Sequence, residues 1–410
     1  MRSWRYWCIF SVFALPSFAE QITLDVAVML SPNQRVAFHQ AFTRFSDESG
    51  IQINFIGMQD AEYKRALNRW LIDKKDTPDV IYWQASQRLF HYVQKGVVLP
   101  ISDIWQRDDL QLHFSHVESS VRYNGEIYAM PFAYYHWGLF YRKSLVSKYG
   151  KLPHKWEDFL TLCARLKVDG ITPIGIGTRQ GWPAAGWFDY INLRMNGLGF
   201  HQRLLAGKIS FYSPQVRAVL VQWKRLIDEG FFLDGHDKLN WDEPLPLFYR
   251  DKIAFTLLGN FVSTSFPDAQ KKEIGFMPFP RIKPIPLFED APMEVFMIAA
   301  NTDKPSAAKR LLRFLARPEV QSGLTAKLGY LSPYRSLEVE GDRFTQEGAG
   351  LLARVAAVGQ FFDRDTLPEF EKMVVPRMAD FLNSGDIERL QQQLEAARIK
   401  VFKPELQRPD

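Results

Sequence analysis

The chain has 410 residues, of which 51 are Lys or Arg and 46 are Asp or Glu, so its net charge is +5. This mild balance, with no Lys/Arg run in the sequence, argues against nucleic acid as a partner. The length predicts two domains, with a core large enough to dispense with disulfides.

The first nineteen residues predict a cleavable secretory signal. A short basic region precedes the apolar segment 6–15, which is too short to span a membrane. A small-x-small pattern at 17–19 places the expected cleavage directly after it. Cys8 lies inside the apolar segment and not at a cleavage site, which argues against a lipoprotein. We therefore expect a freely diffusing protein of the Gram-negative periplasm.

Strands and helices alternate in the next part of the chain. The predicted elements are a strand at 22–30, a helix beginning at Ser31-Pro32, a strand at 51–56, a helix at 63–71 and a strand at 79–83. This order is typical of an α/β domain with a largely parallel sheet. Ligands approach the carboxyl ends of such strands, where Trp83 and Gln84 lie.

The rest of the chain continues this pattern without repeats, low-complexity segments or a flexible linker. The predicted elements are an extended stretch at 125–142, helices at 156–167, 188–195 and 214–229, strands at 171–177, 272–280 and 294–300, a loop at 180–186, helices opened by Pro305 and Pro318, and a last amphipathic helix over 387–401. Gly329 stands where the end of the second Pro-initiated helix is expected. Two domains without a linker indicate that the chain crosses between them more than once.

Common catalytic and cofactor signatures are absent from the sequence. It has no glycine-rich phosphate loop, no metal-binding spacing among its eight histidines and no GxSxG motif. The adjacent acids at 108–109 and 289–290 point to opposite faces of a strand, so neither forms a catalytic pair alone. Cys163 lies on an apolar helix face, which indicates core packing. We expect no enzyme activity, no metal and no cofactor.

Eight segments spread over nearly all of the chain after position 20 form an ordered set. They are TPDVIYW at 77–83, KGVVLPISDIW at 95–105, NGEIYAMPF at 124–132, LPHKWEDFL at 152–160, TPIGIGTRQGWPAAGWFDYINLRMNG at 172–197, GFMPFPRI at 275–282, EDAPMEVFMIAANTDKPSAAKRLLRFL at 289–315 and LGYLSP at 328–333. In this order and after a secretory signal, the set resembles the bacterial extracellular solute-binding proteins (family 1) that serve carbohydrate ABC importers.

The resemblance implies a type II periplasmic-binding-protein-like α/β fold. This is a two-lobed clamp in which each lobe is a mixed sheet flanked by helices, with about three hinge crossings. The implied parts are a signal at 1–19, lobe 1 at 20–131 plus 295–331, lobe 2 at 132–294 plus 332–410, and crossings near 131–135, 292–294 and 331–334. Ligand shifts such clamps toward a closed form, which a membrane permease recognises. The implied partners are a sugar and inner-membrane permease subunits with a separate ATPase, and we expect a monomer.

A sugar requires aromatic platforms for its apolar faces and side chains that both donate and accept hydrogen bonds. The ligand-binding candidates are Trp83, Gln84, Tyr135, His136, Trp182, Trp187, Trp241, Asn260, Asp290 and Arg335. Tyr134 is an alternative to its two successors, and Asn33 and Gln59 are further polar candidates. Phe261 stands where many relatives have tryptophan, and phenylalanine is a weaker platform for a sugar ring than tryptophan. For each aromatic the alternative is core packing, and for the two charged residues it is an exposed loop or hinge charge.

The resulting prediction is a periplasmic protein that binds a mono- or oligosaccharide and delivers it to an ABC permease. One alternative is a sensing module for a membrane kinase or chemoreceptor, since the fold does not separate the two. Another is a periplasmic carbohydrate-active enzyme. Relatives often carry Trp or Gly directly after the first strand, whereas this chain has MLSPN at 29–33. The ligand preference of better-known relatives is therefore not transferred.

Overall fold

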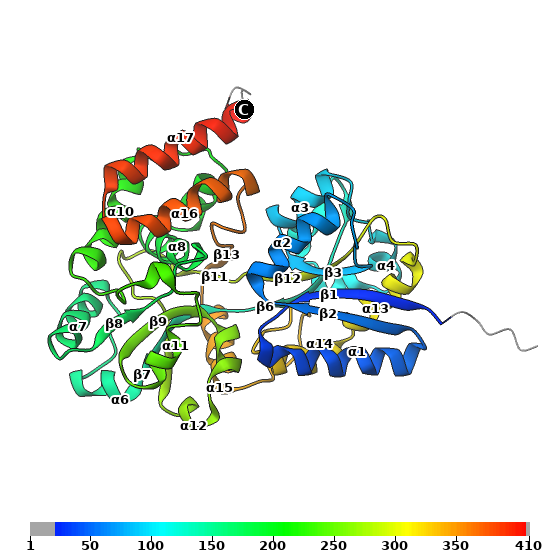
Figure 1. The fold of residues 1–410 in the computed structure, drawn as a ribbon, viewed down its shortest axis with the longest axis horizontal. Helices are drawn as coiled ribbons and strands as arrows, with labels where there is room; N and C mark the ends of the chain where they lie inside the picture. The colour runs from blue at the N-terminus through cyan, green and yellow to red at the C-terminus, as the bar shows by residue number, and fades with distance from the viewer. Residues whose placement is uncertain (1–20, 407–410) are drawn as a thin grey trace, which may run out of the picture.

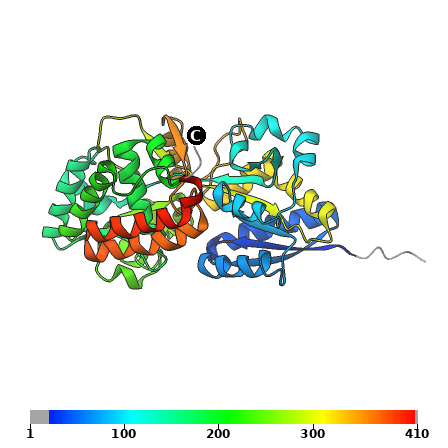
Figure 2. The same cartoon turned by 90° about the horizontal axis from the view of Figure 1, so that it is seen from above.

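The computed structural model describes residues 21–406. The predicted secretory signal and its cleavage site lie outside the described residues. Two halves lie side by side, each built around its own sheet and covered by helices (Figures 1 and 2). In the described range, no helix is both long enough and apolar enough to cross a membrane.

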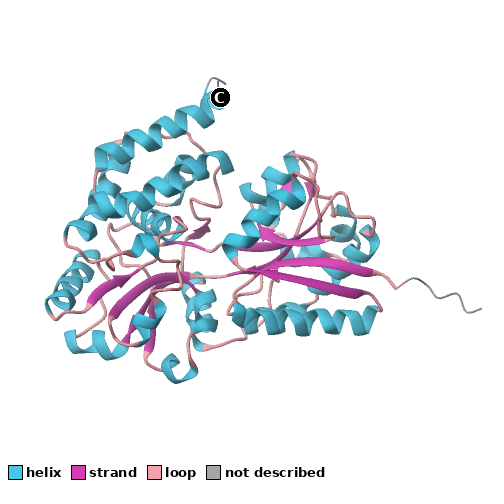
Figure 3. Ribbon diagram, in the orientation of Figure 1, coloured by secondary structure: helices cyan, strands magenta, loops and turns pink. Residues whose placement is uncertain are grey.

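The first half is built on a five-stranded mixed sheet of order β2-β1-β3-β12-β6. Its strands are β1 (Thr23–Met29), β2 (Gln52–Met58), β3 (Val80–Gln84), β6 (Met130–Tyr134) and β12 (Met293–Ile298). β1, β2 and β3 are parallel, whereas β12 runs antiparallel to both of its neighbours. Helices α1 (Arg35–Ser49) and α14 (Pro318–Leu328) cover one face, and α2 (Asp60–Leu71) and α3 (Gln87–Gln94) the other (Figure 3). Both faces of β3 are consequently buried, as expected for a nearly all-apolar strand.

The second half contains a four-stranded sheet of order β10-β7-β9-β8. Its strands are β7 (Trp137–Arg142), β8 (Thr172–Gly175), β9 (Ile253–Gly259) and β10 (Ile274–Met277). Its principal helices are α7 (Trp156–Val168), α8 (Trp182–Asn196), α10 (Pro214–Asp228), α16 (Pro368–Ser384) and α17 (Ile387–Leu406). The last two return the chain to this half and pack beside α8 and α10 (Figure 1).

Shorter elements complete both halves. They are η1 (Pro32–Gln34), α4 (Ser102–Arg107), α5 (Leu110–Phe114), η2 (Glu118–Ser120), β4 (Arg122–Tyr123), β5 (Glu126–Ile127), α6 (Lys143–Val146), η3 (Ser147–Tyr149), α9 (Leu198–Leu205), η4 (His236–Lys238), α11 (Leu245–Tyr249), η5 (Asn260–Ser265), α12 (Asp268–Lys271), β11 (Phe288–Asp290), α13 (Pro305–Leu315), α15 (Arg343–Leu352) and β13 (Ala357–Gly359). β11 and β13 form a separate parallel pair beside α8.

The described chain passes between the two sheets three times. Only residues 135–136 separate β6 from β7, and only residues 291–292 separate β11 from β12. The third passage follows α14, where Tyr134 and Leu331 exchange main-chain hydrogen bonds of 2.9 and 2.8 Å before the chain continues to α15. The two halves are thus joined by three crossing segments and not by a single linker.

Proline and glycine positions set several helix ends as the sequence predicts. α13 and α14 begin at Pro305 and Pro318, and Gly329 ends α14 at φ +70°. One expectation is wrong. The predicted loop at 180–186 ends early, because Gly181 adopts φ +79° and α8 begins at the next residue. Pro131 lies within the edge strand β6, which is a position that tolerates proline, and its partner on β12 is Val295, next to a register irregularity between Glu294 and Val295.

Candidate functional site

A cavity of about 740 Å³ lies between the two halves. The first half supplies the loop after β1, the N-terminal turns of α2 and the last residues of β3. The second half supplies the start of α8, residues 240–243 and the start of η5, and the segment 361–364 closes one side. The cavity therefore opens at the carboxyl ends of the parallel strands β1 and β3, which is the usual ligand position in such sheets.

Aromatic rings from the second half form one wall of this cavity. Trp182 lies 5.7 Å from Trp137 and 6.3 Å from Trp241, measured between ring centroids. Phe261 packs edge-on against Trp241 at 5.2 Å, and Phe361 lies 4.4 Å from Trp137. Trp182, Trp241 and Phe261 are only half-buried, so part of each ring faces the open space. Such rings can contact the apolar face of a solute.

A charged network forms the closed end of the cavity. The Glu294 Oε1 atom accepts hydrogen bonds from the Tyr135 hydroxyl at 3.1 Å and from Arg364 Nη1 at 2.8 Å. Arg364 Nη2 also donates to the Tyr135 hydroxyl at 2.8 Å. Tyr135 in turn stacks on Tyr330 with ring centroids 5.1 Å apart. The network thus joins β12, the first crossing and the segment 361–364.

Electrostatics fix the protonation states of Arg364 and Tyr135 in this network. Burial lowers the pKa of Arg364, but the adjacent Glu294 carboxylate offsets this effect and holds the pKa above its ordinary value. Burial also raises the pKa of the Tyr135 hydroxyl well above its usual range. Arg364 therefore stays charged and Tyr135 stays a hydrogen-bond donor at neutral pH.

Several polar atoms that line this cavity are buried without a hydrogen-bond partner among the described residues. They include Gln84 Oε1, Glu294 Oε2, Trp137 Nε1 and Gln180 Oε1. Gln84 and Glu294 are directly opposed on β3 and β12. Unpaired buried polar groups are costly and uncommon in folded proteins. Because these residues line an open cavity, a hydrogen-bonding solute can supply the missing partners.

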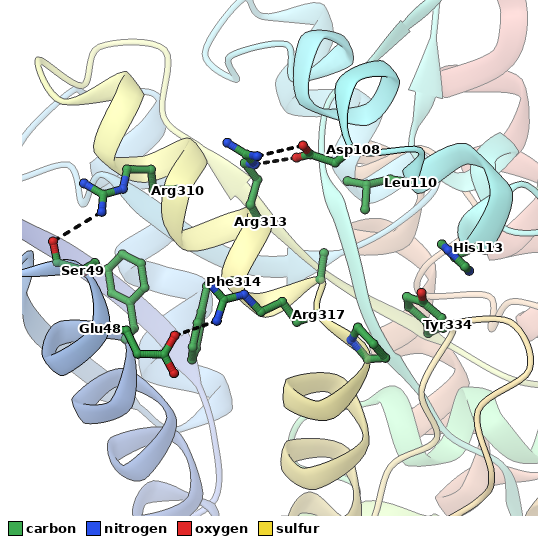
Figure 4. Close-up of a pocket in the computed structure, with 13 residues that line it drawn as sticks. Glu48, Ser49, Asp108, Leu110, His113, Arg310, Arg313, Phe314, Arg317 and Tyr334 are labelled. Carbon is green, nitrogen blue, oxygen red and sulfur yellow. Dashed lines mark hydrogen bonds and ion pairs between the residues drawn. The ribbon is translucent and has the colours of Figure 1, made fainter.

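A second cavity, of about 490 Å³, lies on the first half beside α13 (Figure 4). Three arginines of or beside α13 line it, and each already has an acceptor. Arg313 pairs with Asp108, Arg317 pairs with Glu48 at 2.6 Å, and Arg310 donates to a main-chain carbonyl of α1. Because these guanidinium groups are engaged and no predicted site residue lies here, the cavity between the halves is the better candidate.

The sequence profile described as bacterial extracellular solute-binding protein matches residues 31–322, which is well over half of the chain. The chain belongs to this family. It is accordingly a solute-binding protein and not an enzyme, and the family predicted from the eight segments is confirmed. In the described residues, no group of three or more His, Cys, Asp or Glu side chains could hold a metal ion.

Individual relatives agree with this assignment. An uncharacterized ABC transporter extracellular-binding protein of Pyrococcus horikoshii is 26% identical over 263 residues, covering 62% of this chain and 58% of that protein. This match spans less than two thirds of the relative. The osmoprotective compounds-binding protein GgtB of Synechocystis is 24% identical over 388 residues, covering 85% of each.

A solved structure confirms the predicted fold class. The bacterial solute receptor AcbH, whose preference is for β-D-galactopyranose, superimposes with a TM-score of 0.87 at 21% identity, covering 94% of this chain and 99% of AcbH. The fold of this solute-binding protein is therefore the α/β periplasmic-binding-protein fold, with two mixed sheets flanked by helices.

Four of the ten candidate residues line the cavity of the solute-binding protein. They are Gln84, Tyr135, Trp182 and Trp241, and Gln59 and Phe261 line it as well. Trp83 lies outside the lining because side chains alternate along β3. Its ring packs between Tyr63 of α2, at 6.3 Å, and Tyr92 of α3, at 6.1 Å. Tyr82 and Gln84 take the cavity side of the same strand end.

Three further candidates are packed inside the second half or at the crossings. Trp187 is fully buried against Phe232 and Phe279. His136 is also fully buried, with no hydrogen-bond partner for either ring nitrogen among the described residues, and burial lowers its pKa to about 3. Asn260 donates its amide to the Gly329 carbonyl at 2.8 Å, which ties η5 to the end of α14.

The last two candidates are charged residues at opposite extremes of exposure. Asp290 is completely buried beside β13 and away from the cavity, and burial raises its pKa well above the usual range. Arg335 is exposed after the third crossing, where its main-chain N–H donates to the His113 carbonyl at 3.1 Å. Asn33 is exposed and donates to the Thr264 carbonyl at 3.0 Å, which bridges the two halves.

The residues that sequence reasoning missed are those of the closed end. Glu294 is a single acid within the apolar strand MEVFMI, which is a recognisable signal for a buried functional charge. Arg364, Phe361 and Asp363 follow the short strand β13, and no local pattern distinguishes them. Their place in the cavity depends on the pairing of β13 with β11.

Proposed function

We propose that this protein captures a neutral, hydroxyl-rich solute, a mono- or oligosaccharide, in the periplasm and delivers it to an ABC permease. The observation that carries the proposal is the pairing of an aromatic wall with unpartnered polar atoms in one interlobe cavity. A sugar ring presents apolar faces to the former and hydroxyl groups to the latter. The galactopyranose preference of AcbH and the transporter assignment of the Pyrococcus relative agree with it.

The charges around the cavity also favour a neutral solute. The acidic lining residues are Asp60, Glu62, Asp242, Glu243, Glu294 and Asp363, and the basic ones are Arg35, Lys64, Arg65 and Arg364. Lys64 pairs with Asp60 at 2.9 Å and Arg364 pairs with Glu294, so two of the four basic groups are neutralised locally. The acids are paired as well, since Asp363 and Glu243 form ion pairs with Arg88 and Arg179. The lining charges that have no ion pair among the described residues are Glu62 and Asp242 against Arg35 and Arg65, and this balance favours neither an anion nor a cation.

We also propose that the two halves move as lobes about the three crossings. The proposed lobes are residues 20–131 plus 295–331 and residues 132–294 plus 332–410, except that residues 132–134 of β6 and 293–294 of β12 stay with the sheet of the first half. Because the cavity takes its lining from both, a solute that contacts both walls binds the closed arrangement more tightly and shifts the population toward it. Permease recognition of that arrangement would couple transport to occupancy.

A thermal-shift screen tests the sugar proposal. We expect at least one of D-galactose, maltose, raffinose and trehalose to raise the melting temperature, since a ligand at 100 times its Kd stabilises the folded state by about 2.7 kcal/mol. No shift with any sugar of this panel would contradict the proposal. A rise in permease ATPase activity with the loaded protein would separate transport from sensing for a kinase or chemoreceptor.

A second candidate ligand class comes from the match to GgtB, which binds osmoprotective compounds. Some osmoprotectants carry a quaternary ammonium, which an aromatic cage can bind through cation–π contacts. Glycine betaine in the same screen tests this class. A shift with glycine betaine and with none of the sugars would favour it.

A further inference from the structure

We propose that Glu294 and Gln84 form an acceptor pair that selects the solute by its hydroxyl donors. This inference deepens the proposed function and rests on it. Glu294 Oε2 and Gln84 Oε1 have no hydrogen-bond partner in the described part of the chain, and the two side chains line the cavity while 1% and 2% exposed. The pair therefore defines which groups a solute must bring to the closed end.

The position of the pair follows from strand register. β12 runs antiparallel to β3, and Glu294 lies opposite Gln84. Directly opposed residues project from the same face of a sheet with their Cβ atoms about 5 Å apart. The two free acceptors, Glu294 Oε2 and Gln84 Oε1, are consequently carried on the same face of the sheet, where both residues line the cavity. Two neighbouring hydroxyl groups on one solute can reach both.

The groups around Glu294 occupy one of its two carboxylate oxygens, and the other is available to accept a hydrogen bond from the solute. Arg364 and Tyr135 both donate to Oε1, and Oε2 receives nothing from the described residues. Arg364 pairs with this carboxylate at 2.8 Å, and a carboxylate accepts hydrogen bonds but donates none. A hydrogen bond from a solute hydroxyl to this oxygen is charge-assisted and stronger than a bond between neutral groups.

These acceptors discriminate among chemical classes. A carboxylate or phosphate would bring negative charge against Glu294, and a quaternary ammonium has no donor for either oxygen. Hydroxyl groups donate to the pair and can also accept from Trp137 Nε1, which lines the same cavity without a partner in the described range. The geometry therefore points to a neutral solute with adjacent hydroxyl groups, such as a pyranose.

Isosteric variants test the pair by calorimetry. Glu294→Gln keeps the shape but replaces an acceptor oxygen by a donor, and Gln84→Met removes an acceptor without a change in charge. With D-galactose, maltose, raffinose and trehalose as probes, we expect Glu294→Gln to weaken binding of the sugar that the wild type binds by about 10- to 100-fold, the effect of losing a charge-assisted hydrogen bond. Gln84→Met removes a hydrogen bond between neutral groups, and we expect it to weaken binding by about 3- to 10-fold. Glu388→Gln, on the exposed face of α17, is the control and keeps wild-type affinity.

The outcomes separate this inference from the sugar proposal. If a sugar binds and both variants retain affinity within threefold of the wild type, the acceptor pair is overturned while the proposed function stands. Spermidine, a donor-rich cation, and glycine betaine complete the probe set. Glu294-dependent binding of spermidine alone would overturn the sugar proposal and retain the acceptor role. Absence of binding by every probe would overturn both.

Discussion

Adjacent residues of one strand end have different roles because side chains alternate across a sheet. On β3, Gln84 faces the cavity, whereas Trp83 packs among aromatic rings of α2 and α3 and donates its indole N–H to the Arg88 carbonyl at 3.2 Å. Aromatic character alone therefore does not identify a platform. The partial exposure of Trp182 and Trp241 does, because a solute can reach only an exposed face.

Trp83→Ala is expected to affect stability and not binding. Removal of a large buried aromatic ring from a packed core costs roughly 3–5 kcal/mol of unfolding free energy. Urea denaturation measures this loss, and calorimetry with the panel sugar that binds measures affinity of the folded fraction. Trp241→Ala is the matched variant, for which we expect weaker binding and nearly unchanged stability. Reversal of these two patterns would contradict the assignment of the two rings.

His136 is expected to make the protein less stable in mild acid. Burial lowers its pKa to about 3, while an unfolded histidine titrates near about 6.5. As the pH falls from 6.5 toward 3, the unfolded chain binds a proton that the folded chain excludes, so the unfolding free energy drops by up to about 1.4 kcal/mol per pH unit. Above pH 6.5 the residue contributes no pH dependence.

The variant His136→Leu isolates this effect from other buried groups. We expect its unfolding free energy, measured by denaturant titration between pH 6 and 4, to fall less steeply than that of the wild type by about that slope. His39→Asn, at an exposed position of α1, is the control and is expected to keep the wild-type slope. An unchanged slope in His136→Leu would show that the ring is protonated in the folded state.

At the scale of elements, α15 braces the first crossing between the halves. The His136 ring packs directly against Gly348 of this helix, where an added Cβ would lie 1.7 Å from the ring Nδ1. The main-chain N–H of Asn260 also donates to the His136 carbonyl at 3.0 Å. The crossing is thus held between α15 and η5, which fixes the direction in which β7 leaves the first sheet.

Two glycines of α15 are expected to respond oppositely to alanine. Gly350→Ala has open space around the new Cβ and gains helix propensity, so stability rises by up to about 1 kcal/mol. Gly348→Ala forces the His136 ring to move, and we expect a loss of about 1–3 kcal/mol. Thermal unfolding of the two variants against wild type measures both effects. Equal stabilisation by both substitutions would contradict the close contact at the crossing.

Sequence patterns predict the elements whose bounds are determined by local chemistry. They fail for residues whose position is determined by pairing between distant segments. The helices α13 and α14 begin at proline, as predicted, because proline suits the first turn of a helix. Gln84 at the polar end of β3 and Trp182 after β8 are likewise readable, and both line the cavity. Arg364 is not readable, because its role exists only once the segment after β13 meets Glu294 of a distant strand.

At the scale of the whole molecule, polar contacts away from the crossings hold the halves together. Arg88 of α3 forms ion pairs with Asp363 at 3.3 Å and with Glu371 of α16 at 3.1 Å. Arg88 is only 8% exposed, and burial raises the pKa of Glu371 above its usual value in spite of this cation. The contact therefore depends on the arrangement of both lobes, although Arg88 itself lies outside the cavity lining.

Arg88→Gln is expected to weaken binding without touching the solute. In the closed arrangement the variant leaves the half-buried Asp363 and Glu371 without their shared cation, and loss of a hydrogen-bonded charge partner costs about 1.5–3 kcal/mol. In an open arrangement water can solvate both acids, so the population shifts toward it and the apparent Kd rises at least about tenfold. Calorimetry measures the affinity, and X-ray scattering measures whether the bound sugar still compacts the molecule.

Arg122→Gln removes a surface pair with Glu118 inside the first half and serves as the control. Wild-type affinity and compaction in Arg88→Gln would show that this contact does not contribute to lobe closure.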